Sequence, residues 1–208
     1  MYRLIVLALL AATGAAQAQA SQESGKLLAI QQKKYSLVHE LDIGGMFEPQ
    51  DAFSKGLALE GAYTWHFGDD LSWEVIRGGY VGQLDTGLKS QLINQFGVAP
   101  TSFELLQYYF STALMWSPLY GKFALRNASV VHAEAFFTLG GALGHFTSSF
   151  REGPEVGVGV RVFLTQRLSA RFDARDAVFL HKETDGSLVK QVIFLSIGLS
   201  ISLGGNGG

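Results

Sequence analysis

The segment from 191 to 204 alternates between two kinds of side chain. Its odd positions from 193 to 203 carry isoleucine or leucine, whereas the even positions between them carry serine, glycine or phenylalanine. A period of two is typical of a strand, because successive side chains point to opposite faces of a sheet. The segment is therefore expected to form a strand with one continuous aliphatic face.

The same alternation recurs along the chain, for example from 57 to 67 and from 156 to 164. The composition holds 25 glycines and 15 phenylalanines, and only 16% of the residues are charged. After the N-terminal segment no run of apolar residues is long enough for a membrane-spanning helix. Alternating strands with many aromatic and few charged residues favour a membrane β-barrel.

The pattern predicts eight strands of about 9 to 14 residues or slightly more, a length that suits a tilted bilayer crossing. The expected ranges are 35–46, 56–67, 71–82, 105–116, 129–144, 154–165, 167–180 and 191–204. An even number of strands favours closure, because a closed sheet leaves no unpaired backbone edge in lipid. The predicted fold class is all-β, an eight-stranded antiparallel transmembrane up-and-down β-barrel.

The connections between these strands suggest an orientation. Those at 68–70 and 165–167 are short and are expected in the periplasm, whereas those at 83–104 and 181–190 are long and are expected outside. The connection 117–128 is the exception, because it is long on the periplasmic side. Leu84, Leu88, Leu92 and Phe96 recur every four residues, which predicts a short amphipathic helix in the second outer loop.

The first residues are typical of a secretory signal peptide, with Arg3 ahead of an apolar run and small residues after it. The expected organisation is a signal peptide (1–20), an N-terminal lead-in (21–34), an outer-membrane β-barrel (35–204) and a flexible tail (205–208). Export through this signal places the protein in the cell outer membrane. Outer-membrane lipid and, during insertion, the barrel-assembly machinery are its expected partners.

Charged side chains on the polar parity of the strands are expected to face the interior, because charges are costly in lipid. They are Glu40, Asp42, Glu60, Glu74, Glu134, Arg161, Arg171, Asp173 and Arg175. An eight-stranded barrel is just wide enough to be filled by side chains, so a plugging salt-bridge network is the main expectation. A narrow ion path is the alternative. Arg77 and Asp176 lie on the lipid parity, which predicts a bulge near Gly78 and Gly79, and either a bulge or a rim position at Asp176.

Aromatic residues gather where the second, third and fourth strands meet the periplasmic rim. An aromatic girdle is expected there, because amphipathic rings favour the membrane interface. Its predicted members are Trp65, Phe67, Trp73, Trp116 and Tyr120.

Signals for catalysis, metals and nucleic acid are weak. The five histidines lack metal-ligand spacing, and the chain has no cysteine. Ser129, His132 and Glu134 form a candidate set for a lipid hydrolase, although such a set is common by chance. The net charge of -2 argues against a nucleic-acid partner. No catalytic residue, metal or cofactor is expected.

Several segments together resemble the outer-membrane β-barrel domain proteins found mainly in myxobacteria and related delta-type proteobacteria. They are "AIQQKKYSLVHELDIGG", "PQDAFSKGLALEGAYTWHF", "LSWEV", "SPLYGKFALRN", "HAEAFFTLGGALG" and "GVGVRVFLTQRLSARFDARD". The resemblance implies a small eight-stranded barrel of the outer-membrane protein A transmembrane type. It implies no established activity and no catalytic residues.

The last strand also resembles the C-terminal signal that the barrel-assembly machinery recognises. The matching residues are Ser196, Gly198, Ile201 and Leu203, although the end of the strand is aliphatic rather than aromatic. The predicted function is that of a non-enzymatic outer-membrane barrel with a structural or surface-interaction role. A narrow pore or carrier for small molecules is the first alternative, and an outer-membrane lipid-modifying enzyme is the second.

Overall fold

The computed structural model describes residues 35, 37–49, 54–85, 87–88, 91, 94–95, 104–125, 129–183 and 186–204. Eight strands follow one another in the order of the chain. They are β1 (His39–Glu48), β2 (Ser54–His66), β3 (Leu71–Asp85), β4 (Leu106–Leu125), β5 (Ser129–Phe146), β6 (Phe150–Phe163), β7 (Leu168–Glu183) and β8 (Gly186–Leu203). The described part of the chain has no helix with the length and hydropathy needed for a bilayer crossing.

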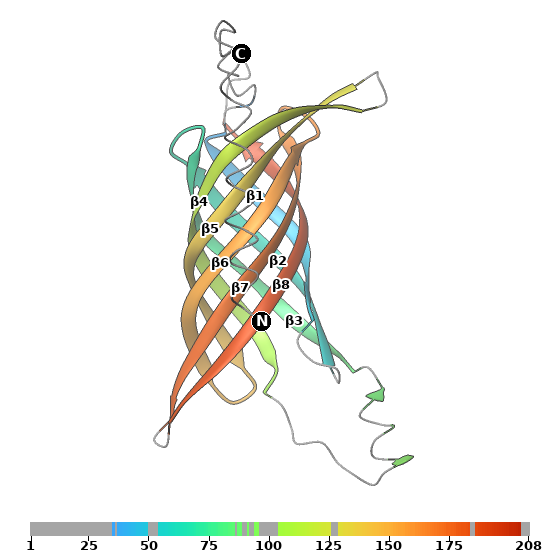
Figure 1. Cartoon of the computed structure of the whole chain (residues 1–208), viewed down its shortest axis with the longest axis vertical. Coiled ribbons are helices and arrows are strands. Elements are labelled where there is room, and N and C mark those ends of the chain that lie inside the picture. The colour runs from blue at the N-terminus through green and yellow to red at the C-terminus, as the bar shows by residue number, and fades with distance from the viewer. Residues whose placement is uncertain are drawn as a thin grey trace, which may run out of the picture. The chain divides into compact units, whose positions relative to one another are not determined.

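The strands form a closed antiparallel barrel in which β1 pairs with both β2 and β8. The β1–β8 pairing runs from His39 opposite Leu203 to Phe47 opposite Leu195. Each strand has two paired neighbours, so closure removes the sheet edges that β1 and β8 would otherwise expose (Figure 1). The predicted fold class, a closed eight-stranded antiparallel barrel, is confirmed.

The two ends of the barrel differ in their connections. The terminal end, where β1 begins and β8 ends, carries the connections 67–70, 126–128 and 164–167. The loop end, where β1 ends, carries 49–53, 86–105, 147–149 and 184–185. The connection 86–105 is the longest one between the described strands. Leu84 of the expected amphipathic helix belongs instead to β3, where it pairs with Lys55, and Leu92 and Phe96 lie outside the described residues.

Two predicted connections are strand instead. The range 117–128 is occupied mainly by β4, which continues to Leu125 because a register shift between Trp116 and Leu119 accommodates Pro118 and pairing with β5 then resumes. The range 181–190 belongs to β7 and β8, which remain paired to Glu183 opposite Gly186. Both hairpins extend past their neighbours, β4–β5 at the terminal end and β7–β8 at the loop end (Figure 1).

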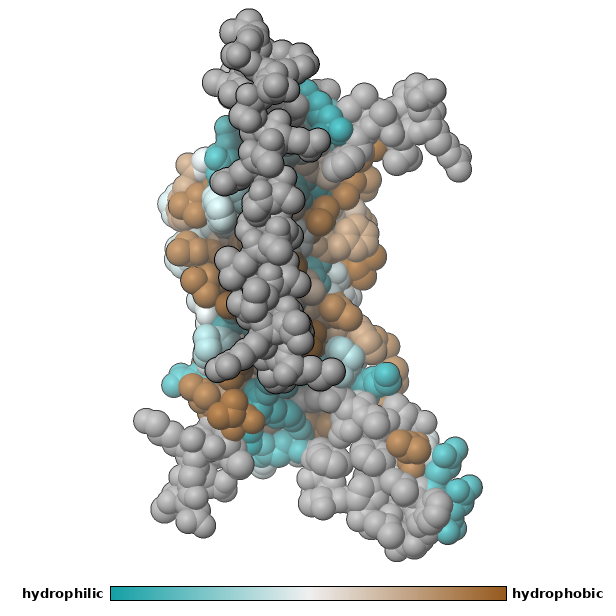
Figure 2. All heavy atoms as spheres, in the orientation of Figure 1, coloured by the Kyte–Doolittle hydropathy of each residue, from teal (hydrophilic) through white to brown (hydrophobic). Residues whose placement is uncertain are grey.

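The outer face of the barrel is apolar along every strand. One member per strand, each at least 46% exposed, illustrates this belt: Ile43, Leu59, Ile76, Leu114, Leu139, Val158, Phe172 and Ile197. Figure 2 shows hydrophobic residues over the visible face between the ends and hydrophilic residues gathered toward the ends. Polar groups are instead buried inside, so the barrel is inverted relative to a soluble domain.

Candidate functional site in the barrel interior

Charged side chains fill the half of the interior nearer the terminal end. All nine residues predicted from the strand parity are buried, none more than 7% exposed, and Arg77 and Glu155 join them. We call this group the charged layer: Glu40, Asp42, Glu60, Glu74, Arg77, Glu134, Glu155, Arg161, Arg171, Asp173 and Arg175. Because these side chains are buried, each charge depends on its partners rather than on contact with solvent.

Glu74 on β3 lies at the centre of the charged layer. Its carboxylate accepts hydrogen bonds from Arg171 Nη2 at 2.8 Å, from Arg175 Nη1 at 2.8 Å and from Arg77 Nε at 3.2 Å. β3 and β7 stand four strands apart in the closed order of eight, so they form opposite walls. The bonds to Arg171 and Arg175 therefore cross the full width of the interior.

Asp173 on β7 binds the same three guanidinium groups from the other wall. It accepts from Arg171 Nε at 2.9 Å, from Arg175 Nε at 3.1 Å and from Arg77 Nη2 at 3.2 Å. Arg77 Nη1 also donates to Glu60 at 2.7 Å. Each guanidinium thus bridges at least two carboxylates, an arrangement that satisfies several of its donors at once.

A second ion cluster lies closer to the terminal end. Arg161 Nη2 donates to Glu40 at 2.6 Å, and Nη1 donates to Glu134. The same Glu40 oxygen lies 2.9 Å from His66 Nε2. This cluster joins β1, β2, β5 and β6 around one guanidinium.

Asp42 is held by a hydroxyl rather than by an arginine. It accepts a hydrogen bond from Ser200 on β8 at 2.6 Å, across the closing pair of strands. The carboxylate is also near Gly198, where an added Cβ would come within 2.8 Å of Asp42 Oδ1. A glycine at 198 therefore leaves room for this inward carboxylate.

Two members of the charged layer were not predicted. Arg77 was expected on the lipid face with a bulge near Gly78, but the register shifts at Val75, three residues earlier, and this turns Arg77 inward. Glu155 shares the parity of Gly157 and Arg161 and bonds to Arg175 at 2.8 Å. Glu155 therefore has the inward parity in the sequence, but it lies one residue before 156, where the alternation described for this strand begins.

The half of the interior nearer the loop end is mainly apolar, apart from the buried Glu48 at the end of β1, and this apolar filling was not predicted. Met46 follows Asp42 along β1, and Phe179 follows Arg175 along β7, so these side chains lie beyond the charges. We call this group the apolar layer: Met46, Ala58, Val81, Leu106, Tyr109, Ala142, Phe146, Ala177, Phe179, Val192 and Phe194. Rings dominate it, including an edge-to-face pair of Phe146 and Phe179 with centroids 5.3 Å apart.

Tyr109 joins the two layers. Its ring stacks on Phe194 with centroids 5.1 Å apart, and its hydroxyl donates to Glu60 of the charged layer. The amphipathic ring thus packs against the apolar side chains while its polar end satisfies a buried carboxylate.

A cluster of polar contacts covers the apolar layer at the loop end. Glu104, at the end of the connection 86–105, binds the Arg151 guanidinium and the Ser148 hydroxyl, and its carbonyl accepts from Lys190. Thr147 N donates to Leu105 O at 3.0 Å. We call this group the clasp. The Ser148 hydrogen bond and the nearby Arg151 guanidinium hold the pKa of Glu104 below its usual range.

The Arg151 and Lys190 side chains also pack on the apolar layer. The Arg151 guanidinium lies 5.1 Å from the centre of the Phe146 ring, and Lys190 Nζ lies 4.7 Å from it. Both cations are therefore held between an aromatic face and the acceptors of Glu104.

Aromatic residues lie on part of the outer face near both ends of the barrel. Trp65, Phe67, Trp73 and Trp116 are exposed on the outer face near the terminal end, as their parity indicates. Tyr120, which was expected to join them, instead packs against the inner-facing rings of His132 and Phe163, because the register shift at Pro118 reverses its parity.

A second aromatic band lies on the outer face near the loop end. It consists of Tyr80, Tyr108, His145 and Phe150, whose successive ring centroids are 5.1, 6.2 and 4.3 Å apart. No aromatic group was predicted at this end. Two bands with an apolar belt between them match the distribution of amphipathic rings at two membrane interfaces.

The residues of the predicted C-terminal signal lie on both faces of β8. Ser196 is buried and faces inward, whereas Ile201 and Leu203 are about half exposed on the outer face. Asp176 is regularly paired with Val156 and Ile193 in the middle of β7, so neither the expected bulge nor the expected rim position occurs, and it accepts a hydrogen bond from Gln191 at 2.6 Å.

Two of the three candidate hydrolase residues, His132 and Glu134, are buried inside the barrel. His132 packs on Tyr35 and Glu134 binds Arg161, both inside the barrel, while the Ser129 side chain lies outside the described part. Within the described ranges, no group of three histidine or acidic residues has a geometry that would hold a metal ion.

Comparison with known proteins found no matching protein-family model and no matching curated protein. Several solved outer-membrane barrels are similar to this chain. Neisserial surface protein A is 16% identical over 79% of this chain and 96% of its own, with a TM-score of 0.41.

The N-terminal β-barrel domain of OprF from Pseudomonas aeruginosa is 10% identical over 80% of this chain and 100% of its own, with a TM-score of 0.44. The attachment invasion locus protein Ail of Yersinia pestis is 10% identical over 81% and 100%, with a TM-score of 0.36. At these identities the function of this chain rests on its own geometry.

Proposed function

We propose that this protein is a non-enzymatic, integral outer-membrane β-barrel with a structural or surface-interaction role and a lumen that is closed to ions. We place it with the myxobacterial barrel proteins that its sequence segments resemble. Outer-membrane lipid is its immediate partner, and the terminal end faces the periplasm.

The membrane location is supported by the apolar belt. Large aliphatic and aromatic side chains such as Leu59 (69% exposed) and Leu139 (65% exposed) cover the outside, while arginines and carboxylates are buried. In water this distribution would leave an extended apolar surface unfavourably hydrated, whereas in lipid it places each group in a matching environment. The two aromatic bands then lie at the two interfaces.

The closed lumen is carried by one observation, the contact of Glu74 with arginines on the opposite wall. Arg171 and Arg175 reach Glu74 at 2.8 Å from β7, and these contacts across the interior support a lumen that is closed at this depth. The apolar layer and the clasp lie beyond it toward the loop end. A narrow pore could conduct only if these contacts between opposite walls were broken.

Planar-bilayer recording tests the closed lumen. We expect no steady openings from the purified protein, with insertion verified independently by protease protection and oriented circular dichroism. A variant in which Glu74, Arg171 and Arg175 are all replaced by serine is the positive control, because it removes the cross-wall contacts and should conduct. Steady openings of the unchanged protein would overturn the proposal of a closed lumen.

The proposed assembly signal needs its own test. Assembly into vesicles by the purified barrel-assembly machinery should be slower for Gly198→Ala with Leu203→Ala than for the unchanged chain. Unassisted folding into detergent separates recognition from stability, since Gly198 also lies against Asp42. Equal assembly rates, with equal unassisted folding, would rule out the signal.

A further inference from the structure

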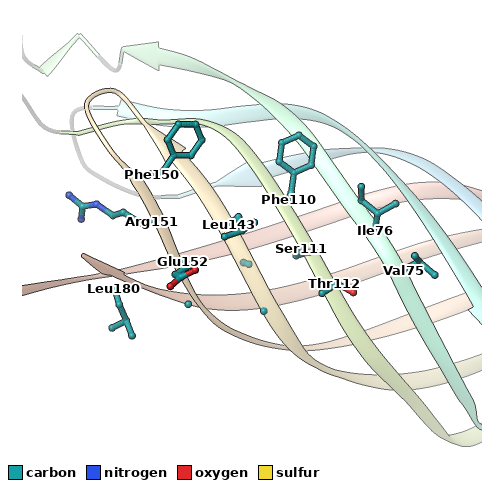
Figure 3. Close-up of a pocket in the computed structure, with 13 residues that line it drawn as sticks. Val75, Ile76, Phe110, Ser111, Thr112, Leu143, Phe150, Arg151, Glu152 and Leu180 are labelled. Carbon is teal, nitrogen blue, oxygen red and sulfur yellow. The ribbon is translucent and has the colours of Figure 1, made fainter. Parts of the chain in front are cut away.

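An apolar groove lies on the outer face of the barrel, across β3 to β7. It has a volume of about 1010 Å³, and its lining includes Ile76, Phe110, Thr112, Leu143, Phe150 and Leu180. Figure 3 shows Phe150, Phe110 and Ile76 rising in a row from three different strands. This volume is at the upper end of the range for small-molecule sites.

The groove exists because small residues interrupt the belt of large side chains. Gly141 lies on the outward parity of β5, between the exposed positions Leu139 and Leu143. A Cβ added at Gly141 would have only the carbonyl oxygen of Gly153 nearby, at 3.7 Å, so the space above this glycine is open. Thr112, next to it on β4, is also short and pairs directly with Gly141.

The groove runs obliquely from the middle of the belt to the loop end. Its row of paired residues leads from Phe110 to Leu143 to Glu152 to Leu180. At one end, Val75 and Ile76 lie a few residues beyond the terminal-end Trp73. At the other end, Phe150 begins β6 and Leu180 lies close to the end of β7.

The two ends of the groove differ in polarity. The end near Ile76 is apolar and lies midway between the two aromatic bands. The end near the loop carries the exposed carboxylate of Glu152 and the backbone of Arg151. A ligand that fits this gradient has a long apolar chain and a polar head at the membrane surface.

We propose that this groove is a specific binding site for one acyl chain of an outer-membrane lipid, with the headgroup beside Glu152. The site rests on the proposed membrane location, because it is continuous with the lipid-facing belt and only lipid reaches it there. An acyl chain in the groove is contacted by side chains on several sides, whereas a chain against the rest of the outer face is contacted on one side only.

Trp73 provides a natural reporter for the site. Its indole Nε1 donates to Thr112 Oγ1 at 2.9 Å, so the ring lies beside the deep end of the groove. A chain in the groove would bring its terminal methylenes close to this indole. Bromine atoms near the end of an acyl chain would then quench Trp73 fluorescence.

The experiment titrates brominated phosphatidylethanolamine into the full-length protein in detergent micelles that contain no other phospholipid. The protein carries Trp65→Phe and Trp116→Phe, which leaves Trp73 as the only tryptophan. We expect saturable quenching near one lipid per barrel, with one retained lipid counted by native mass spectrometry.

Gly141→Leu fills the groove and is expected to weaken this binding about tenfold, because the leucine side chain blocks contact with about two methylene groups. Gly45→Leu is the matched control. Gly45 also faces outward, on β1 at the opposite wall, and an added Cβ there meets only Ala58 O at 3.8 Å. It should bind like the unchanged protein.

Equal quenching curves for Gly141→Leu and Gly45→Leu, or quenching without saturation, would overturn the site. The membrane location is tested separately in vesicles of brominated lipid, where the exposed Trp65 should be quenched in a Trp65-only variant whatever the state of the groove. Absence of that quenching would count against the proposed location itself.

Discussion

The charged layer and the apolar layer occupy the same barrel, one above the other, yet they hold it together in different ways. In the charged layer, opposite walls are joined by directed bonds such as those from Arg171 and Arg175 to Glu74. In the apolar layer, rings such as Phe146 and Phe179 pack without directional demands. One interior is thus held together both by specific pairing and by close packing of volume.

The two layers should respond differently to substitution. A buried ion is tolerable only while its partners remain, because its desolvation cost is offset by them. A buried ring instead requires a side chain of similar volume. The charged layer is therefore sensitive to the loss of a charge, and the apolar layer to the loss of volume.

The largest effect is expected for Glu74→Gln. The substitution keeps the shape but removes the carboxylate shared by Arg77, Arg171 and Arg175, which leaves buried guanidinium charge uncompensated. We expect the free energy of unfolding to fall by about 5 kcal/mol, the upper end for a broken buried pair.

Urea unfolding in lipid vesicles, followed by tryptophan fluorescence, measures this change. Asp70→Asn in the exposed turn after β2 is the matched control, and its effect should stay within about 0.5 kcal/mol. A similar small effect for Glu74→Gln would mean that the charged layer does not depend on its pairing.

The next effect is expected for Phe179→Ala. The side chain is fully buried among Phe146 and Ala177, so truncation leaves a cavity and should lower the free energy of unfolding by about 3 kcal/mol. Phe179→Leu largely conserves volume and should cost less than about 1.5 kcal/mol. The same unfolding assay compares the two variants, and equal losses would contradict a layer held by volume.

A smaller effect is expected where the layers meet. Tyr109→Phe keeps the ring on Phe194 but removes the hydroxyl that donates to Glu60. Glu60 still has Arg77 as a partner, so the expected loss is about 1.5 kcal/mol, the value of one hydrogen bond to a charged group.

The loss from Tyr109→Phe should shrink in a background with Glu60→Gln, since the charge that the hydroxyl serves is then gone. A double-mutant cycle over these two positions measures the coupling. Purely additive losses would mean that Tyr109 contributes to the apolar layer alone.

The charged layer was largely predictable because a charge in an otherwise apolar strand has one suitable face. Asp42 and Arg171, for example, follow directly from strand parity. Arg77 and Tyr120 did not, because bulges at Val75 and near Pro118 reverse the parity after them. A single extra residue shifts every later side chain to the other face.

The apolar layer left no signal in the sequence. On β8, Val192 and Phe194 face inward, whereas Ile193 and Leu195 face outward. Both faces of the strand are apolar there, so the alternation of polarity that marks the inner face is lost. Which of these side chains fill the interior is decided only when the barrel closes. The clasp was equally hidden, because it brings together residues that are distant in the chain, such as Glu104 and Lys190.

The smallest effect is expected from the clasp, and it depends on pH. The pKa of Glu104 is lowered in the folded protein, so its contribution is fully present above the unfolded pKa, about 4.3, and is lost as the pH falls through the lower folded value. The carboxylate is partly exposed and screened, so the contribution is about 0.5 kcal/mol. Hydrogen exchange at the Thr147 amide, which donates to Leu105, measures opening of the clasp. Relative to Glu104→Gln, the unchanged protein should be more protected at neutral pH and equally protected at low pH. A constant difference across this range would mean that the clasp does not depend on the charge of Glu104, and the loop end would then be closed by the apolar layer alone.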